Sequence, residues 1–224
     1  MNNNKTKILN FIERLSLFFI LSFIIINGIL HSDSYIAIIS AICGITYTFF
    51  AGKGFPICYI FGIIGSSFYS YLSFQNALWG NLLLYAGYYI PMQILGYYKW
   101  NRHLKKDKNE ILKISLSARE LTILIFILIV FSFVIYYLLL YLKDGHPLLD
   151  STTTVFSIGG MYLTVRRAIE QWIFWMFVNT LSLAMWIKVA LTGEPVLSTV
   201  IMWGVYLILA IYFYINWHKE VYSK

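Results

Sequence analysis

The chain has 224 residues, of which 59% are hydrophobic, 19% aromatic and only 12% charged. A soluble domain carries about a quarter charged residues, so this composition excludes a soluble enzyme or a disordered chain and predicts a protein that crosses a membrane several times. The net charge is +7, and the two cysteines, Cys43 and Cys58, lie in apolar runs, which favours small core residues over a disulfide scaffold.

Apolar runs separated by short polar breaks predict eight membrane-spanning helices. The first run follows two lysines as a signal peptide would, but it lacks a clear small-residue cleavage site and is therefore interpreted as a helix. The sixth run is short and rich in Ser, Thr and Gly. In chain order, the predicted spans are Leu15–Leu30, Ser34–Phe50, Phe55–Phe74, Leu78–Tyr98, Leu121–Leu142, Ser151–Thr164, Ile169–Leu191 and Val196–Trp217.

Basic residues indicate the orientation of the spans, because Lys and Arg accumulate in cytoplasmic loops. With the N-terminus inside, all 17 basic residues except Lys143 and Lys188 fall on the cytoplasmic side. The sequence therefore predicts a multi-pass protein with both termini in the cytoplasm. The charge of +7 then reflects topology, so we expect the lipid bilayer as a partner and no nucleic acid.

Two short motifs recur and indicate an internal repeat, although aromatic composition alone could also produce the matches. Each pair brackets three spans, and both repeats point the same way through the membrane, which resembles the parallel three-helix repeats of the SWEET architecture. The motifs are Gly44-Ile-Thr-Tyr47 with Gly159-Gly-Met-Tyr162, and Tyr97-Tyr-Lys-Trp100 with Tyr214-Ile-Asn-Trp217.

The repeat predicts how the chain is divided. An extra N-terminal membrane helix precedes a first three-helix bundle, a cytoplasmic basic loop, a linker helix, a second three-helix bundle and a cytoplasmic tail. The boundaries of these segments are 1–33, 34–100, 101–119, 120–143, 144–217 and 218–224. The predicted fold is an all-α membrane protein of about eight spans, with a SWEET-like 3+1+3 helix bundle and an extra N-terminal helix.

Asp, Glu, Lys and Arg are missing from the middle of every predicted span, and the four histidines lie in loops or at helix ends. An intramembrane enzyme or an ion-coupled transporter needs ionisable groups at depth. The sequence therefore predicts neither enzymatic chemistry nor ion coupling. Two separated thiols are too few to bind a metal, and no cofactor is expected.

The seventh span carries aromatic and amide side chains near its middle. Trp172, Trp175 and Asn179 lie three and four residues apart, which places them on one helix face, and Gln171 precedes them. Two indoles beside an amide form a cradle for a flat polar or cationic ring. The alternative is that the indoles belong to an interfacial belt and that Asn179 holds two helices together.

The fourth span carries a second set of polar groups. Asn81 and Tyr85 are four residues apart on one face, Pro91 lies well inside the span, and Gln93 follows it. Proline removes a backbone hydrogen bond and tends to kink a helix, which would direct the Gln93 amide into the bundle. The alternative is a kink that serves packing alone. Taken together, the fourth and seventh spans favour a cavity lined by amides and indoles.

These segments resemble the PnuC family of vitamin transporters over most of the chain, from about Tyr35 to Trp217. The resemblance implies a SWEET-like fold and facilitated diffusion of nicotinamide riboside across the bacterial inner membrane. It also implies a functional link to a cytoplasmic kinase that phosphorylates the riboside and so maintains net uptake. The matching residues are Trp79-Gly-Asn81, Tyr85, Pro91-Met-Gln93, Gly96-Tyr97, Trp100, Gln171-Trp172, Trp175 and Asn179.

The same resemblance implies which residues bind the substrate, and it leaves alternatives open. Thiamine, which is also cationic and aromatic, or another B vitamin could be carried in place of the riboside. A membrane receptor or interaction subunit without transport is a different class, although neither terminus carries a long signalling tail. A homo-oligomer is also open. The implied substrate-binding residues are Trp172, Trp175, Asn179, Gln93, Asn81, Tyr85 and Gln171.

Overall fold

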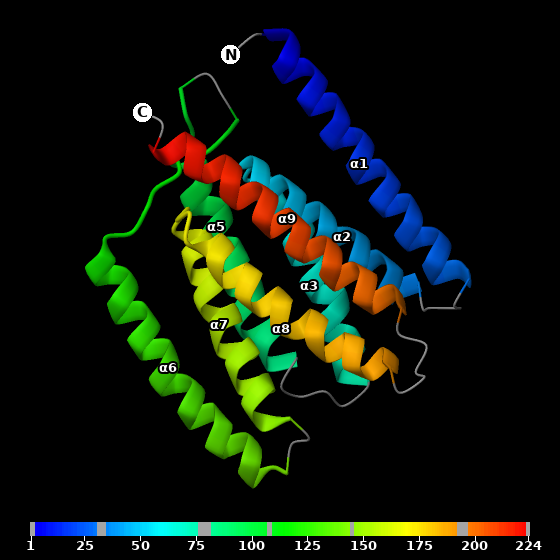
Figure 1. The fold of residues 1–224 in the computed structure, drawn as a ribbon, viewed down its shortest axis with the longest axis vertical. Coiled ribbons are helices and arrows are strands. Elements are labelled where there is room, and N and C mark those ends of the chain that lie inside the picture. Colours follow the sequence, from blue (N-terminus) through cyan, green and yellow to red (C-terminus); the bar gives the residue numbers. More distant parts are fainter. Residues whose placement is uncertain are drawn as a thin grey trace.

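The computed structural model describes residues 3–30, 35–75, 82–106, 109–143, 146–191 and 197–222. Nearly all of these residues are helical (Figure 1), and the β-type pairing among them consists of isolated bridges. In chain order the elements are α1 (Asn3–Leu30), α2 (Tyr35–Lys53), α3 (Cys58–Gln75), the π-helix η1 (Leu83–Tyr89), α5 (Ile90–Asn101), α6 (Ala118–Tyr141), α7 (Pro147–Val165), α8 (Gln171–Leu191) and α9 (Leu197–Tyr222).

Each predicted span coincides with a helix in the same order, so the all-α class is confirmed. By length and composition, three of the described helices are apolar enough to cross a membrane, over Phe11–Leu30, Ala118–Tyr141 and Val200–Tyr222. The helix found at the sixth predicted span is longer than the predicted range Ser151–Thr164. This helix is α7, which begins at Pro147, because proline suits the first turn of a helix, where its missing N–H would have no partner.

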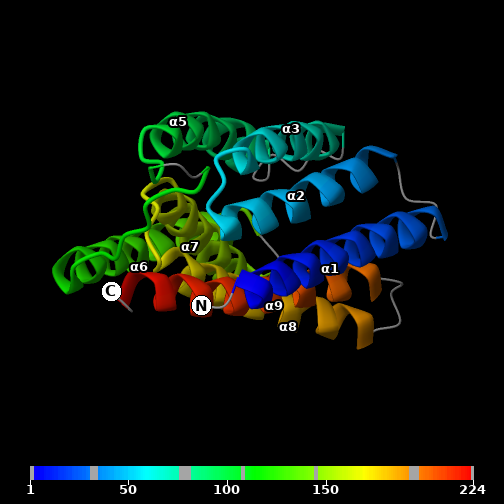
Figure 2. The same ribbon diagram turned by 90° about the horizontal axis from the view of Figure 1, so that it is seen from above.

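The helices pack in layers around the middle of the molecule. Figure 2 shows α3 and α5 on one side and α8 and α9 on the other, with α2 and α7 between them. Within these layers α2 packs on α3, α3 on α5, α7 on α8 and α8 on α9, while α5 meets α7 and α2 meets α9. Helix α6 lies along α7 at one edge, and only Leu128 among its residues is buried.

The irregularity predicted at Pro91 takes the form of a π-helical segment. Pro91 lies in the first turn of α5, directly after η1. Its ring would clash with the carbonyl four residues earlier in a regular helix. The N–H of Ile90 instead donates to the carbonyl of Tyr85, five residues earlier, which is the spacing of a π-helix. The chain thus enters α5 without a regular α-helical turn at Pro91.

One end of the bundle gathers most of the basic residues that are described, and we call it the basic end. It comprises the end of α2 at Lys53, the loop 102–117, the turn at Arg166 and Arg167, and the last turn of α9. In Figure 1 this is the end where α1 begins and α9 finishes. The distribution agrees with the prediction that the basic loops lie on one side of the membrane.

The loop 102–117 is more than the charged connection that the sequence predicts. Ile111 is fully buried, and its N–H donates to the Gly54 carbonyl at 3.0 Å. Ile114 pairs with the turn after α7, because its N–H donates to the Arg167 carbonyl and its own carbonyl accepts from the Ile169 N–H. The loop therefore ties the end of α2 to the turn after α7.

Helix α1 is held against the rest of the bundle by a buried carboxylate. Glu13 accepts from the Lys53 ammonium of α2 and from the Tyr212 hydroxyl of α9. A buried carboxylate is tolerated only when it is paired and hydrogen-bonded, and Glu13 is both. These two contacts fix α1 to α2 and α9 at the basic end.

Candidate functional site

A cavity of about 1360 Å³ lies inside the bundle. Its wall is formed by α1, α2, α3, η1, α5, α7, α8 and α9, and it mixes aromatic rings with amides and hydroxyls. Ligand sites in proteins are concave, mostly apolar, and carry a few polar groups that orient the ligand. The cavity therefore has the composition of a binding site for a small aromatic and polar molecule.

The residues predicted on the seventh span lie together on the cavity wall. Gln171, Trp172, Trp175 and Asn179 of α8 all line it. The Trp175 indole donates to Thr164 Oγ1 at 3.3 Å, while the Trp172 ring lies 5.5 Å from the ring centre of Phe213. Gln171 is fully buried and donates to the Ala168 carbonyl, so it fixes the start of α8.

The fourth predicted span supplies the facing wall. Gln93 is buried in α5, and its Nε2 donates to Ser66 Oγ at 3.1 Å. Tyr85 lines the cavity from η1 and packs on Tyr69, with ring centres 4.3 Å apart. Asn81 lies outside the described residues. All predicted site residues that the structure describes therefore line one cavity.

Two buried polar atoms in this wall have no hydrogen-bond partner among the described residues. They are the acceptor Gln93 Oε1 and the donor Trp172 Nε1. Buried polar groups in native proteins are nearly always paired, because an unpaired group loses its bonds to water without replacement. One acceptor and one donor are thus left unpaired in residues that line the cavity.

Several cavity residues were not singled out as site residues from the sequence. The most prominent are three tyrosines, Tyr47, Tyr89 and Tyr206, which come from α2, η1 and α9. Asp150, in the first turn of α7, also lines the cavity and lies at a helix end, not at midspan. The abundance of tyrosine in the chain was a signal, but it does not distinguish a cavity wall from a surface that faces lipid.

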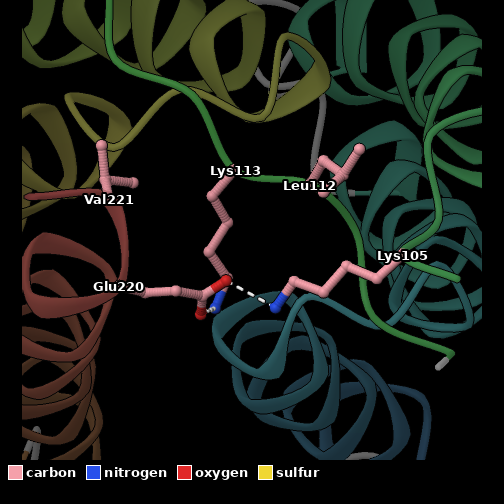
Figure 3. A pocket seen from close by; sticks show the side chains of 5 residues that line it. All are labelled: Lys105, Leu112, Lys113, Glu220 and Val221. Atoms are coloured by element: carbon pink, nitrogen blue, oxygen red, sulfur yellow. Dashed lines mark hydrogen bonds and ion pairs between the residues drawn. The ribbon is translucent and has the colours of Figure 1, made fainter. Parts of the chain in front are cut away.

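A smaller pocket of about 270 Å³ lies at the basic end (Figure 3). Lys105 and Lys113 both contact the Glu220 carboxylate, with N–O distances of 2.5 Å. Burial lowers the pKa of Lys113, and its bond to Glu220 works against that effect. Because both ammonium groups already bind a carboxylate, this pocket offers little charge to an anionic ligand.

Two of the helices that line the cavity, α1 and α9, are among the three described helices that are long and apolar enough to cross a membrane, and a ligand-sized cavity among such helices suits a membrane transport protein. The family model described as nicotinamide mononucleotide transporter matches residues 34–219. The chain belongs to this family of PnuC transporters, as the resemblance in its sequence predicts. The match begins after α1, so this helix lies outside the family model.

Individual relatives agree with this assignment. The chain is 32% identical over 198 residues to the nicotinamide riboside transporter PnuC of Neisseria mucosa, which covers 86% of this chain and 75% of that one. It is 30% identical over 197 residues to the protein of the same name from Haemophilus influenzae, with coverage of 84% and 81%. The transporter family and the apolar helices together indicate a multi-pass protein of the bacterial inner membrane.

The fold agrees with a solved structure as well. The crystal structure of the vitamin B3 transporter PnuC superimposes with a TM-score of 0.81 at 31% identity, and the superposition covers 95% of this chain and 92% of that one. The family and these relatives are all named as transporters.

Proposed function

We propose that this protein carries nicotinamide riboside into the cytoplasm by facilitated diffusion, as a uniporter. The observation that carries the proposal is the cavity wall, which brings two indoles, an Asn and an unpaired Gln acceptor to one site. Two curated relatives that bear the name nicotinamide riboside transporter support the same substrate. Net uptake would follow from a cytoplasmic kinase that phosphorylates the riboside and so prevents its return.

The chemistry of the riboside matches the groups in the wall. Its pyridinium ring is flat and cationic, and the faces of Trp172 and Trp175 attract such a ring through cation–π contact. Its carboxamide offers an N–H donor to the unpaired Gln93 Oε1. Asn179 is a second amide for the carboxamide, Gln171 fixes the start of the helix, and Tyr85 with Asn81 suits the ribose hydroxyls.

Transport then requires the site to face each side of the membrane in turn. We assign residues 34–100 and 144–217 to two three-helix bundles that rock against each other, with 120–143 as the linker helix. Segment 1–33 is the additional helix, while the loop 101–119 and the tail 218–224 are cytoplasmic, as are both termini. The contacts of α5 with α7 and of α2 with α9 are the surfaces between the bundles in this arrangement. The exposed apolar face of α6 suits lipid or a second copy of the chain.

Pro91 is a candidate hinge in this motion, together with Gly44 and Gly159. Replacing Pro91 by alanine allows a regular helix in place of the π segment, so we expect the initial rate of riboside uptake into proteoliposomes to fall roughly fivefold. Pro147→Ala is the matched control, because Pro147 lies in the first turn of α7, where proline is tolerated. A Pro91→Ala protein that transports at the wild-type rate would show that the hinge assignment is wrong.

The proposed function is tested by ligand binding to detergent-purified protein, followed by tryptophan fluorescence. We expect nicotinamide riboside to quench the signal, thiamine to leave it unchanged, and Trp175→Ala and Asn179→Ala to remove most of the riboside response. Asn101→Ala is the control, because that exposed amide binds the Tyr97 carbonyl at the end of α5, outside the cavity.

The other outcomes are equally informative. Quenching by thiamine alone would keep the transporter class and change the substrate. No response to either compound would return the α8 face to a packing role and contradict the proposed site.

A further inference from the structure

A layer of fully buried side chains lies at the basic end, beside the cavity. Trp100 and Trp217 are fully buried, and so is Ile111 of the connecting loop. Trp100 ends α5 and Trp217 lies in the last turns of α9. The two indoles occupy matching places in the two recurring sequence motifs, so they are related by the predicted repeat.

Both indoles bind the helix that begins the opposite bundle. Trp100 Nε1 donates to the Thr164 carbonyl of α7 at 2.9 Å. Trp217 Nε1 donates to the Gly52 carbonyl of α2 at 2.7 Å. Each acceptor lies near the C-terminal end of its helix. The two hydrogen bonds thus cross between the proposed bundles in the same way, once in each direction.

This layer closes one end of the cavity. The cavity wall reaches Ala51 and Thr164, and the two indoles donate to the carbonyl of Thr164 itself and to that of the residue after Ala51. Protein interiors are packed as densely as organic crystals, so a solute of the size of a nucleoside cannot cross a fully buried layer. Passage toward the basic end therefore requires α5 to separate from α7 and α9 to separate from α2.

The two indoles of the proposed substrate cradle, Trp172 and Trp175, contact residues of both hydrogen bonds. Trp175 donates to the hydroxyl of Thr164, the residue whose carbonyl accepts from Trp100. Trp172 meets Trp217 edge to face, with ring centres 5.6 Å apart and planes at 82°. Each of the two indoles that would hold the substrate thus contacts a residue that forms one of the two hydrogen bonds between the bundles.

We propose that Trp100 and Trp217 are a pair of equivalent latches that hold the cavity shut at the basic end. A ligand that moves Trp172 or Trp175 changes a contact of one latch directly, so binding in the cavity loosens the closed end. The identity of that ligand rests on the proposed function, whereas the latches themselves are defined by the hydrogen bonds between helices.

The two native cysteines report on this layer without any added label. Cys58 begins α3, is fully buried, and belongs to the same core cluster as Trp100 and Trp217. Its neighbour Tyr59 packs edge to face on Trp100, with ring centres 5.0 Å apart. Cys43 is also buried, but it lies in α2 nearly three helical turns before Lys53 and outside that cluster. Alkylation by N-ethylmaleimide, read by peptide mass spectrometry, measures both thiols in one sample.

Trp100→Phe and Trp217→Phe keep an aromatic ring and remove the N–H donor. We expect each variant to raise the alkylation rate of Cys58 about tenfold, as the loss of one such hydrogen bond allows, and to leave Cys43 unchanged. Trp203→Phe is the matched control, because it makes the same change in α9 about 21 Å from Trp217 along the helix. An unchanged Cys58 rate in both latch variants, or an equal rise at Cys43, would overturn the proposal.

The proposed link between ligand binding at the cradle and the two latches is tested by measuring alkylation with ligand present. In wild-type protein we expect saturating nicotinamide riboside to raise the Cys58 rate, and we expect Trp175→Phe to lose that rise. A constant Cys58 rate in protein that binds the riboside would contradict the link. The measurement without ligand is independent of the substrate, so a failed substrate assignment and a failed latch give different results.

Discussion

Replacing Gln93 by methionine is expected to lower the affinity for nicotinamide riboside about ten- to a hundredfold, without lowering thermal stability. Gln93 Oε1 is buried with no partner among the described residues, so it costs stability in the empty protein. A ligand N–H that meets this oxygen gains a hydrogen bond, and losing such a partner at a buried site costs about 1–3 kcal/mol. Methionine fills nearly the same volume with an apolar, flexible side chain.

Stability and affinity should therefore change independently in this variant. The lost bond from Gln93 Nε2 to Ser66 Oγ offsets the removal of the unpaired oxygen, so the midpoint of thermal unfolding should be equal to wild type or higher. Gln75→Met makes the same chemical change at an exposed site on α3 and should alter neither quantity. Equal riboside affinity in the two variants would remove Gln93 from the proposed site.

The membrane class and the order of the helices could be predicted from the sequence because apolar runs directly reflect burial in lipid. The structure of the segments that connect the helices was harder to predict from the sequence. The sequence predicts 101–119 as a charged loop, yet Ile111 and Ile114 make the backbone contacts that tie α2 to the turn after α7. Single apolar residues among lysines form no periodic pattern that would indicate burial. Their role depends on partners that are far away in the chain.

The candidate site shows a similar division. Helical spacing places Trp172, Trp175 and Asn179 on one face, and the structure puts that face on the cavity wall. Spacing cannot show which neighbouring helices complete the wall, so Tyr47 and Tyr206 were not identified as site residues. Binding by these residues stays a prediction, whereas their common location is observed.

The tryptophans at the basic end illustrate what only the fold supplies. In the sequence, Trp100 and Trp217 serve as markers of the repeat and, for Trp100, of the family motif. Their hydrogen bonds to Thr164 and Gly52 join residues that are far apart in the chain. No local pattern predicts such contacts, because they depend on how two bundles meet.

Replacing Gly52 by alanine is expected to lower the free energy of unfolding markedly, because the added methyl group has no room at this position. A Cβ at this position would lie 2.2–2.3 Å from three ring atoms of Phe213. Phe213 is 1% exposed and cannot move aside, because its ring packs on Phe49, Trp172 and Tyr212. Inserting a methyl group into a packed core costs about 1–3 kcal/mol, which lowers the unfolding midpoint of a chain of this size by roughly 2–12 °C.

The matched control is Gly204→Ala on α9, where an added Cβ meets no atom within 4 Å. Thermal unfolding in detergent should separate the two variants, with Gly204→Ala equal to wild type or slightly more stable, since alanine favours the helix. Phe213 contacts the cradle residue Trp172, and Gly52 supplies the acceptor for Trp217. Gly52→Ala should therefore weaken riboside binding as well as folding, and equal midpoints for the two glycine variants would show that this end of the bundle is loosely packed.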